Sequence, residues 1–358
     1  MGPFYLQLLA IAFLNLNIDY QKKFPLKIKL IILFLLLSMT TFAQALRRKT
    51  TLLMGSKFEI TIVAKDAQTA ENNIDSVINE ISRIEFLISD WKPASQISQV
   101  NINAGIKPIK VDREVFNLTK RALYLSKITG GAFDISFAAM DRIWKFDGSM
   151  TEMPTAEAIR KSVERVGYKN IILDSVNSTI YLKTKGMKIG FGALGEGYAA
   201  DHCRNMMLKK GIKAGIVNGS GDMSTWGKHP KGNHWTIGIT NPFQRDSLYA
   251  VVPLKNSAVV TSGSYEKFVV FDGKRYSHII NPVTGYPATG LTSVTIFGPD
   301  AELANGFSTS IMVLGKEAGL KFINQFPKFS CIMFGDDGQV YHSKNLSQRT
   351  INQWKKGP

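Results

Sequence analysis

Cysteine is scarce in this sequence: its 358 residues include only Cys203 and Cys331. Two cysteines are too few for a scaffold held by several disulfides or for a cysteine-rich zinc module. Because the two lie far apart, on segments of different type, we predict two buried thiols rather than a disulfide. The sequence also lacks internal repeats and low-complexity linkers, which favours one continuous domain.

Acidic residues are few relative to basic ones, with 28 Asp and Glu against 44 Lys and Arg, a formal charge of +16. Such a charge bears on solubility and on attraction to anions, not on fold. Nucleic acids, acidic membrane surfaces and phosphate-bearing ligands are all compatible with this charge as partners. Nucleic acid is the weakest of these, because the basic residues are scattered rather than gathered in one stripe. With 44% hydrophobic and 20% charged residues, the composition excludes a disordered or fibrous protein.

Residues 1–43 have the layout of a secretory signal peptide. Lysines precede the apolar run Leu30–Leu37, and small residues then precede a potential cleavage site ahead of Gln44. We therefore expect an exported, periplasmic protein whose mature domain spans residues 44–358. The alternative is an uncleaved anchor that tethers the domain to the inner membrane, although the run is short for a full span. A second apolar run, Phe4–Leu14, is not needed by a signal peptide and leaves open a later start of translation.

The hydrophobic spacing of the remaining chain mixes strand and helix periods. Phe58, Ile60 and Ile62 alternate with polar residues, which predicts a half-buried strand. Apolar residues recurring between Ile74 and Ile88 predict a long amphipathic helix. Since regular βαβ alternation is missing, we predict an α+β domain with mixed, mostly antiparallel sheets flanked by helices. Further helices are predicted at 115–129, 198–210, 304–314 and 317–326, and further strands at 215–217, 235–239, 248–252, 267–271, 291–297 and 330–334.

Four segments carry glycines and polar side chains that packing alone does not explain. In one of them, four glycines precede the helix predicted at 198–210 and leave bare backbone, whose N–H groups would face a phosphate. A close helix–sheet packing turn is the alternative explanation of these glycines. The segments are GGAFDIS at 130–136, IGFGALGEGYAAD at 189–201, NGSGD at 218–222, and TSGSY at 261–265 together with YSHIINPVTGYP at 276–287.

The other candidate residues also have structural alternatives. A single histidine such as His278 is more often a satisfied surface or core residue than a catalytic one. The sequence at 261–263 is compatible with a plain turn at a strand end. Asp134 and Asp222 follow glycine-rich turns, where aspartate commonly caps backbone N–H groups.

Taken together and in this order, the four segments resemble the FAD:protein FMN transferase family, or ApbE-like proteins. The resemblance runs from Met54 to Gly315, nearly the whole mature chain, and includes ANGFST at 304–309. The combination of TSG with YSHIINPxTGYP is specific to this family.

The resemblance implies an exported enzyme that takes FAD as substrate and uses Mg²⁺ as cofactor. It would transfer the FMN half of FAD to a Ser or Thr hydroxyl of an acceptor flavoprotein, such as a subunit of a membrane redox complex, and release AMP. Catalysis of such a transfer is mostly positioning and neutralisation of phosphate charge. No nucleic-acid partner is expected.

The resemblance also implies roles for individual residues. His278 would be the base near the acceptor hydroxyl, or a phosphate contact. Mg²⁺ would be held by the backbone carbonyl near Gly195 and by the side chains of Asn305 and Thr309, which lie four residues apart at a helix start and hence on one face. The residues implied to line the FAD cleft are Met54, Asp134, Gly192, Gly195, Gly221, Asp222, Thr261, Ser262, Gly263 and Tyr265.

The sequence departs from the family pattern at three positions. Family members usually carry Asp where this chain has Asn305, and Asp and Lys where it has Gly190 and Glu196. Asn offers Mg²⁺ a carbonyl oxygen without charge, so Glu196 is a candidate for the missing carboxylate. Two alternatives to the transferase therefore stay open: an FAD pyrophosphatase, in which water replaces the acceptor hydroxyl, and a noncatalytic exported FAD-binding protein.

Overall fold

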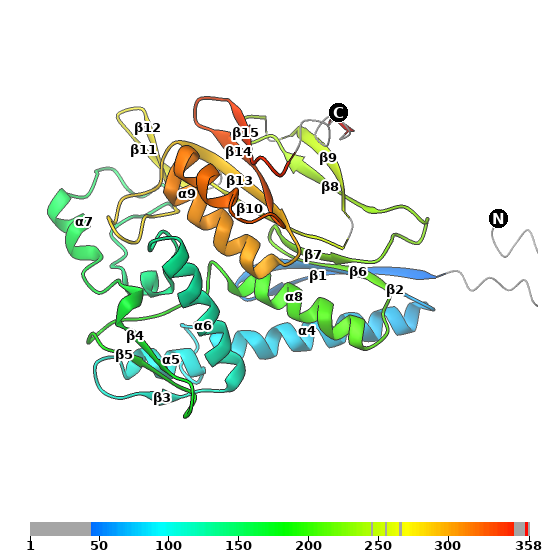
Figure 1. Ribbon diagram of the computed structural model, residues 1–358, viewed down its shortest axis with the longest axis horizontal. Helices are drawn as coiled ribbons and strands as arrows, with labels where there is room; N and C mark the ends of the chain where they lie inside the picture. The colour runs from blue at the N-terminus through cyan, green and yellow to red at the C-terminus, as the bar shows by residue number, and fades with distance from the viewer. Residues whose placement is uncertain (1–43, 245, 255, 265–266, 347–354, 357–358) are drawn as a thin grey trace, which may run out of the picture. The chain divides into compact units, whose positions relative to one another are not determined.

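The described chain begins with a β-hairpin. Strands β1 (Ala45–Leu53) and β2 (Ser56–Ala64) pair antiparallel around the turn Met54-Gly55. Both turn residues have positive φ, 55° and 78°, which matches the right-handed twist of paired strands. The computed structural model describes residues 44–358 apart from 245, 255, 265–266, 347–354 and 357–358 (Figure 1). The predicted signal peptide, residues 1–43, lies outside the described residues.

These two strands form one edge of an eight-stranded sheet with the order β1-β2-β6-β7-β10-β13-β14-β15 (Figure 1). Neighbouring strands pair antiparallel throughout. The predicted α+β class with mostly antiparallel sheets is therefore confirmed. The other strands of this sheet are β6 (Ala214–Gly219), β7 (Asp222–Trp226), β10 (Ala258–Gly263), β13 (Leu291–Gly298), β14 (Ser330–Gly335) and β15 (Val340–His342).

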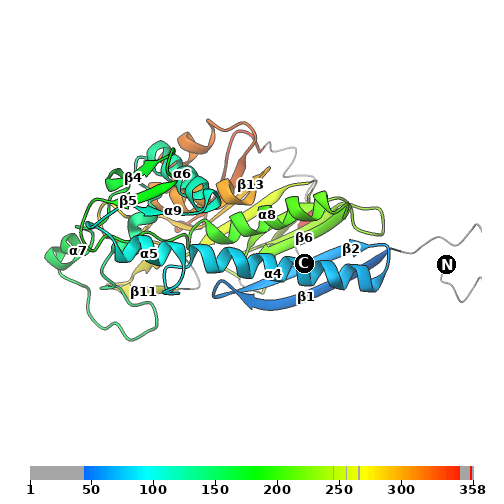
Figure 2. The same ribbon diagram turned by 90° about the horizontal axis from the view of Figure 1, so that it is seen from below.

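Helices α4 (Ala67–Ile88), α8 (Gly195–Lys209) and α9 (Ala301–Ile323) pack against one face of this sheet, and Figure 2 shows α4 and α8 side by side along β2 and β6. The apolar stripe of α4, for example Ile74 and Ile81, is buried in the main core as its spacing predicts. Burying each such side chain is worth about 1.5–3 kcal/mol, so this layer holds the helices on the sheet.

A second sheet covers the opposite face of the main sheet. It consists of β8 (Trp235–Thr240), β9 (Leu248–Leu254) and β16 (Lys355–Lys356). Its apolar side chains form a separate buried cluster with residues of the main sheet such as Val63. Because both faces are covered here, the strand predicted as half-buried is buried on both faces at its C-terminal end, where Thr61 and Val63 are inaccessible.

The chain between α4 and α8 forms a smaller layer with its own sheet, in the order β3-β5-β4. Its apolar residues, such as Val115 and Ile180, belong to the main core. This layer brings the segments 132–138 and 190–196 to the cavity described below. Its elements are α5 (Gln96–Ile102), β3 (Ile109–Lys110), α6 (Arg113–Ile128), η1 (Ile135–Ala139), α7 (Ala156–Ser162), η2 (Tyr168–Asn170), β4 (Ile171–Asp174) and β5 (Thr179–Leu182). A separate hairpin follows β10 in the chain and consists of β11 (Phe268–Phe271) and β12 (Lys274–Ser277).

Most predicted elements are present with shifted ends. The helix predicted at 198–210 begins three residues earlier, at Gly195, so the last glycines of the block are helical. The two helices predicted at 304–314 and 317–326 correspond to α9, whose helical geometry is broken at Gly315 (φ 77°, ψ 179°). The strands that were not predicted include β1, β7 and β10 of the main sheet. In the part of the chain that the structure describes, no helix is both long and apolar enough to cross a membrane.

Cys203 and Cys331 are both buried and free, as predicted. Burial raises the pKa of Cys331 to about 12 and raises the pKa of Cys203 further. Because the thiolate is the reactive form, we expect no reaction of the native protein with a disulfide reagent such as DTNB at pH 8, and two thiols titrated after unfolding in guanidinium. Rapid labelling of the native protein would contradict the burial of these thiols.

Candidate functional site

The site lies where two neighbouring strands differ in length. β10 pairs with β7 at Ala258 and Val259. The β6–β7 hairpin then turns at Ser220-Gly221, whereas β10 continues to Gly263. Both turn residues have positive φ, 48° and 110°, which glycine adopts without strain and serine does not. The end of β10 therefore has β13 on one side and a cavity on the other.

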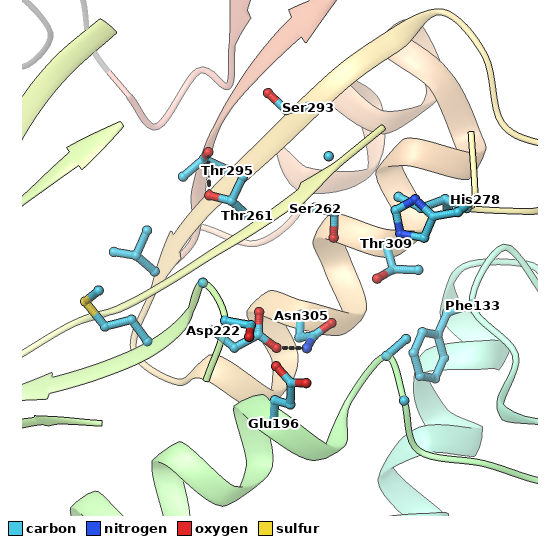
Figure 3. Close-up of a pocket in the computed structure, with 18 of the residues that line it drawn as sticks. Phe133, Glu196, Asp222, Thr261, Ser262, His278, Ser293, Thr295, Asn305 and Thr309 are labelled. Atoms are coloured by element: carbon cyan, nitrogen blue, oxygen red, sulfur yellow. Dashed lines mark hydrogen bonds between the residues drawn. The ribbon is translucent and has the colours of Figure 1, made fainter. Parts of the chain in front are cut away.

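This cavity has a volume of about 750 Å³ and is lined by residues from widely separated parts of the chain (Figure 3). It brings together most of the residues that the sequence singled out. Met54 and Gly195 are not part of its lining, and Tyr265 lies outside the described residues. The predicted residues that do line it are Asp134, Gly192, Gly221, Asp222, Thr261, Ser262, Gly263, His278, Asn305 and Thr309.

Hydrogen bonds fix the start of the glycine block, residues 189–190, before the chain enters the cavity wall. The side-chain amide of Asn101 donates to the Ile189 carbonyl at 2.9 Å and accepts from the Ile189 N–H at 2.8 Å. The next N–H, that of Gly190, donates to the carbonyl of Ile135 at 2.9 Å. These bonds join the block to α5 and to the segment that begins η1, so the following residues are held in place.

Within the block, two glycines face in different directions. No atom lies within 4 Å of the position that a Cβ at Gly192 would take, so this backbone is open to the cavity. A Cβ at Gly195 would instead meet the side-chain ends of Met54 and Ile88, both at 3.1 Å. Gly195 and Met54 therefore lie behind the wall, and their predicted contact with a ligand is not supported by the cavity lining.

Oxygen-bearing side chains gather at the inner end of the cavity (Figure 3). Asn305 and Thr309 project from one face of α9, four residues apart. The amide of Asn305 donates a hydrogen bond to the carboxylate of Asp222, the first residue of β7. Glu196, in the first turn of α8, reaches the same space and accepts from the hydroxyl of Ser56.

Both carboxyl groups in this set have raised pKa values. Burial raises the pKa of Asp222 well above its usual value, and the charge of Glu196 raises it further, against the hydrogen bonds from Asn305 and the Gly197 N–H. Burial also raises the pKa of Glu196, with partial opposition from the Ser56 hydroxyl. Two such carboxylates together attract a cation, since a positive charge would favour both ionised forms.

The donors at this end suit a hard cation. The described residues contain no group of three or more His, Cys, Asp or Glu that would hold a metal by themselves. The set formed by Glu196, Asp222, Asn305 and Thr309 is instead two carboxylates, an amide and a hydroxyl, all oxygen ligands of the type that Mg²⁺ prefers. The residues therefore fit the predicted ion.

The TSG segment is the end of strand β10, not an isolated turn. Its hydroxyls are engaged on opposite faces of the sheet: Thr261 bonds to Thr295 of β13 and Ser262 bonds to Ser308 of α9, each at 2.8 Å between oxygens. These bonds hold the end of β10 between β13 and α9. The segment therefore shapes the cavity through its placement.

His278 lies at the exposed side of the cavity, directly after β12. Its ring Nδ1 is 3.1 Å from the carbonyl oxygen of Lys267, and its backbone N–H donates to the same carbonyl at 3.0 Å. Because a carbonyl only accepts, Nδ1 carries the proton in the neutral ring and Nε2 is the basic nitrogen. The ring also meets Phe146 edge-on, with centroids 6.4 Å apart.

Asp134 lines the cavity but is occupied by local structure, as its structural alternative predicts. Its carboxylate accepts from the backbone N–H and hydroxyl of Ser136, and from the N–H of Tyr168 at 2.8 Å. It thereby joins η1 to η2. Burial raises its pKa despite these hydrogen bonds.

Several lining residues were not singled out from the sequence. Asp90 follows α4 and lies beside Gly190: a Cβ added at Gly190 would be 3.2 Å from a carboxylate oxygen of Asp90. Ser293 and Thr295 come from β13, and an apolar wall comes from Ile237 and Ile239 of β8. None of them belongs to a local motif, because only the tertiary fold brings them to this place.

A family model described as the ApbE family matches residues 54–333. This chain belongs to the ApbE family. The family predicted from the motifs is thereby confirmed over most of the chain, and the glycine block and the His278 turn of this ApbE domain meet in one cavity.

Curated relatives and solved structures agree with this assignment. The FAD:protein FMN transferase of Treponema pallidum is 28% identical over 319 residues, covering 84% of this chain and 88% of the relative, and that of Klebsiella pneumoniae is 30% identical over 278 residues, covering 77% and 85%. The ApbE protein of Thermotoga maritima superposes with a TM-score of 0.76 at 29% identity, covering 84% of this chain and 98% of that one. The apo flavinyl transferase ApbE of Pseudomonas stutzeri gives 0.74 at 25% identity, covering 86% and 98%.

Proposed function

We propose that this chain is an FAD:protein FMN transferase acting on a Ser or Thr hydroxyl of an exported acceptor protein. The observation that best supports the proposal is the convergence of the open glycine backbone, the oxygen side chains of β7 and α9, and His278 on one cavity (Figure 3). The names of the relatives, FAD:protein FMN transferases, supply the substrate.

The cavity has properties that suit FAD. Its volume of about 750 Å³ lies within the range of small-molecule sites, roughly 300–1,000 Å³. The wall formed by Ile237 and Ile239 is apolar and suits a planar ring. The open backbone at Gly192, just before the N-terminus of α8, suits the pyrophosphate, because N–H groups and the helix dipole both favour an anion.

The proposed reaction exchanges one phosphate bond for another. The acceptor oxygen attacks the flavin-side phosphorus, the phosphoanhydride bond breaks, and AMP leaves with the bridging oxygen. Nε2 of His278 takes the proton of the acceptor hydroxyl, while the hydrogen bond from Nδ1 to Lys267 holds the ring in orientation. The exposed position of His278 suits this role, since a protein substrate must reach it.

We also propose that Asn305 and Thr309 hold Mg²⁺, and that Glu196 supplies the negative charge that Asn305 lacks. When bound, the ion would neutralise charge on the phosphates during transfer. Asp222 holds the Asn305 amide through its hydrogen bond and leaves the carbonyl oxygen of the amide to the ion. The predicted contribution of the backbone carbonyl near Gly195 stays a prediction, as do export to the periplasm and an acceptor in a membrane redox complex.

The deciding experiment incubates the purified protein with FAD and Mg²⁺ and co-expresses it with exported candidate acceptors. We expect an FMN-sized adduct on a Ser or Thr peptide by mass spectrometry, together with AMP release. AMP and free FMN without an adduct would instead indicate a pyrophosphatase. Bound FAD without AMP would indicate a noncatalytic flavin-binding protein.

Substituting His278→Ala should lower the rate of FMN transfer by about 10²–10⁴-fold, the usual contribution of a general base. FAD affinity, measured by fluorescence titration, should change little, because the ring lies at the exposed side of the cavity. His342→Ala, at an exposed histidine outside the cavity lining, is the control. Equal rates of FMN transfer for His278→Ala and wild type would contradict the proposal that His278 is the general base.

Substituting Glu196→Gln keeps the side-chain shape and removes its charge. The Mg²⁺ concentration for half-maximal transfer should rise about 10-fold or more, as for other residues that support a metal site. The increase in melting temperature on adding Mg²⁺ and FAD should shrink in parallel. Glu59→Gln, at a half-buried strand position whose carboxylate forms an ion pair with Arg48, is the matched control. An unchanged Mg²⁺ dependence in Glu196→Gln would refute the role.

Substituting Gly192→Ala tests the pyrophosphate position. The methyl group has open space and no strained φ, so the melting temperature should stay close to wild type. FAD binding should weaken about 5- to 150-fold, because the methyl would crowd the phosphates at a cost of about 1–3 kcal/mol. Gly195→Ala, whose methyl points into the core, is the control and should leave FAD affinity largely intact.

A further inference from the structure

Two cross-connections join strand β7 to helix α9. The first is the hydrogen bond from Asn305 to Asp222 inside the cavity. The second passes through a side chain of a third element, Asp201 of α8. One oxygen of Asp201 accepts from the hydroxyl of Ser224 at 2.8 Å, and the other accepts from the backbone N–H groups of residues 301 and 302, at 2.6 and 3.0 Å.

The two connections are spaced alike on both elements. Asp222 and Ser224 are two residues apart on β7, which is about 7 Å along a strand. Asn305 and Ala301 are four residues apart on α9, which is about 6 Å along a helix. The earlier strand residue, Asp222, is connected to the later helix residue, Asn305, and Ser224 is connected to Ala301. The helix therefore runs opposite to the strand, and the two connections lie parallel to each other. The length of one connection between β7 and α9 therefore constrains the length of the other.

The surroundings of Asp201 leave it little freedom. Its side chain is 10% exposed, and Ser224 is fully buried. One turn earlier on α8, a Cβ at Gly197 would lie 2.5 Å from the carbonyl oxygen of Ala301, so the two helices are as close as backbone allows. A cap on α9 that comes from the neighbouring helix thus ties three elements together at one point.

We propose that Asp201 is a positioning residue that sets the separation of β7 and the start of α9, and through it the placement of Asp222 relative to Asn305 and Thr309. Asp201 does not line the cavity, so it acts on the site only through these elements. The effect on FMN transfer rests on the proposed function, whereas the effect on geometry does not.

The test compares two caps of the same helix end. Asp300 is the N-cap of α9 and accepts from the Leu303 N–H at 2.9 Å, a bond that stays within the helix. Asp201→Ala and Asp300→Ala each remove a cap, but only Asp201→Ala cuts the connection to β7. Crystal structures should show the Asp222–Asn305 hydrogen bond retained in Asp300→Ala and lost in Asp201→Ala. The same bond retained in both variants would overturn the proposal, whether or not the protein binds FAD.

The activity of the same variants gives a second measure. Asp201→Ala should raise the Mg²⁺ concentration for half-maximal transfer about 10-fold or more, while Asp300→Ala should lower only the melting temperature. Asp201→Asn should restore the wild-type Mg²⁺ dependence, because its oxygen can accept from α9 while its amide donates to Ser224. Equal Mg²⁺ dependence of Asp201→Ala and Asp300→Ala would count against the inference.

Ser224→Ala keeps the experiment decisive if Asp201→Ala does not fold. It removes only the strand end of the connection and leaves α9 capped. We expect the same direction of change as for Asp201→Ala with a smaller size, and an unchanged Asp222–Asn305 bond and Mg²⁺ dependence would refute the role. A wild-type protein that binds no FAD would refute the proposed function alone, since the crystallographic comparison stands without ligand.

Discussion

The site depends on one difference in length between neighbouring strands. The β6–β7 hairpin turns back at Ser220-Gly221, while β10 runs on to Gly263 beside β13. A sheet with strands of equal length would place backbone where the cavity now lies. Because the sheet is covered on both faces, this interruption at its middle has a wall on each face: helices α8 and α9 on one, β8 on the other. Polar groups can then gather inside a domain that is otherwise well packed.

The parts of the site that the sequence predicted are those written as local motifs. The glycines before α8, the TSG segment and His278 were found because turn chemistry and bare backbone are visible residue by residue. The sequence did not distinguish the role of Asp134 from that of Asp222. Asp134 turns out to hold η1 and η2 together, whereas Asp222 faces Asn305 and Glu196, and only the tertiary structure distinguishes them.

What escaped prediction has identifiable physical causes. β1 carries an exposed run of basic and polar residues, so it lacks the alternation that marks a half-buried strand. β10 is apolar in its first half and polar in its second, because the second half borders the cavity instead of the core. Asp90 and Ser293 sit in unremarkable local sequence, and the fold alone brings them to the wall. Element type could therefore be predicted where burial alternates regularly, but not where a strand is exposed, as in β1, or borders the cavity, as in β10.

The raised pKa values of Asp222 and Glu196 make the stability of the fold depend on pH. Each carboxyl holds its proton more tightly in the folded chain than in the unfolded one, so each favours the fold at low pH and this contribution is lost as the pH rises through the raised pKa. Ionisation of both groups would place two negative charges close together at the buried inner end of the cavity. A cation held there would favour both ionised forms, so its binding would release protons and strengthen as the pH rises.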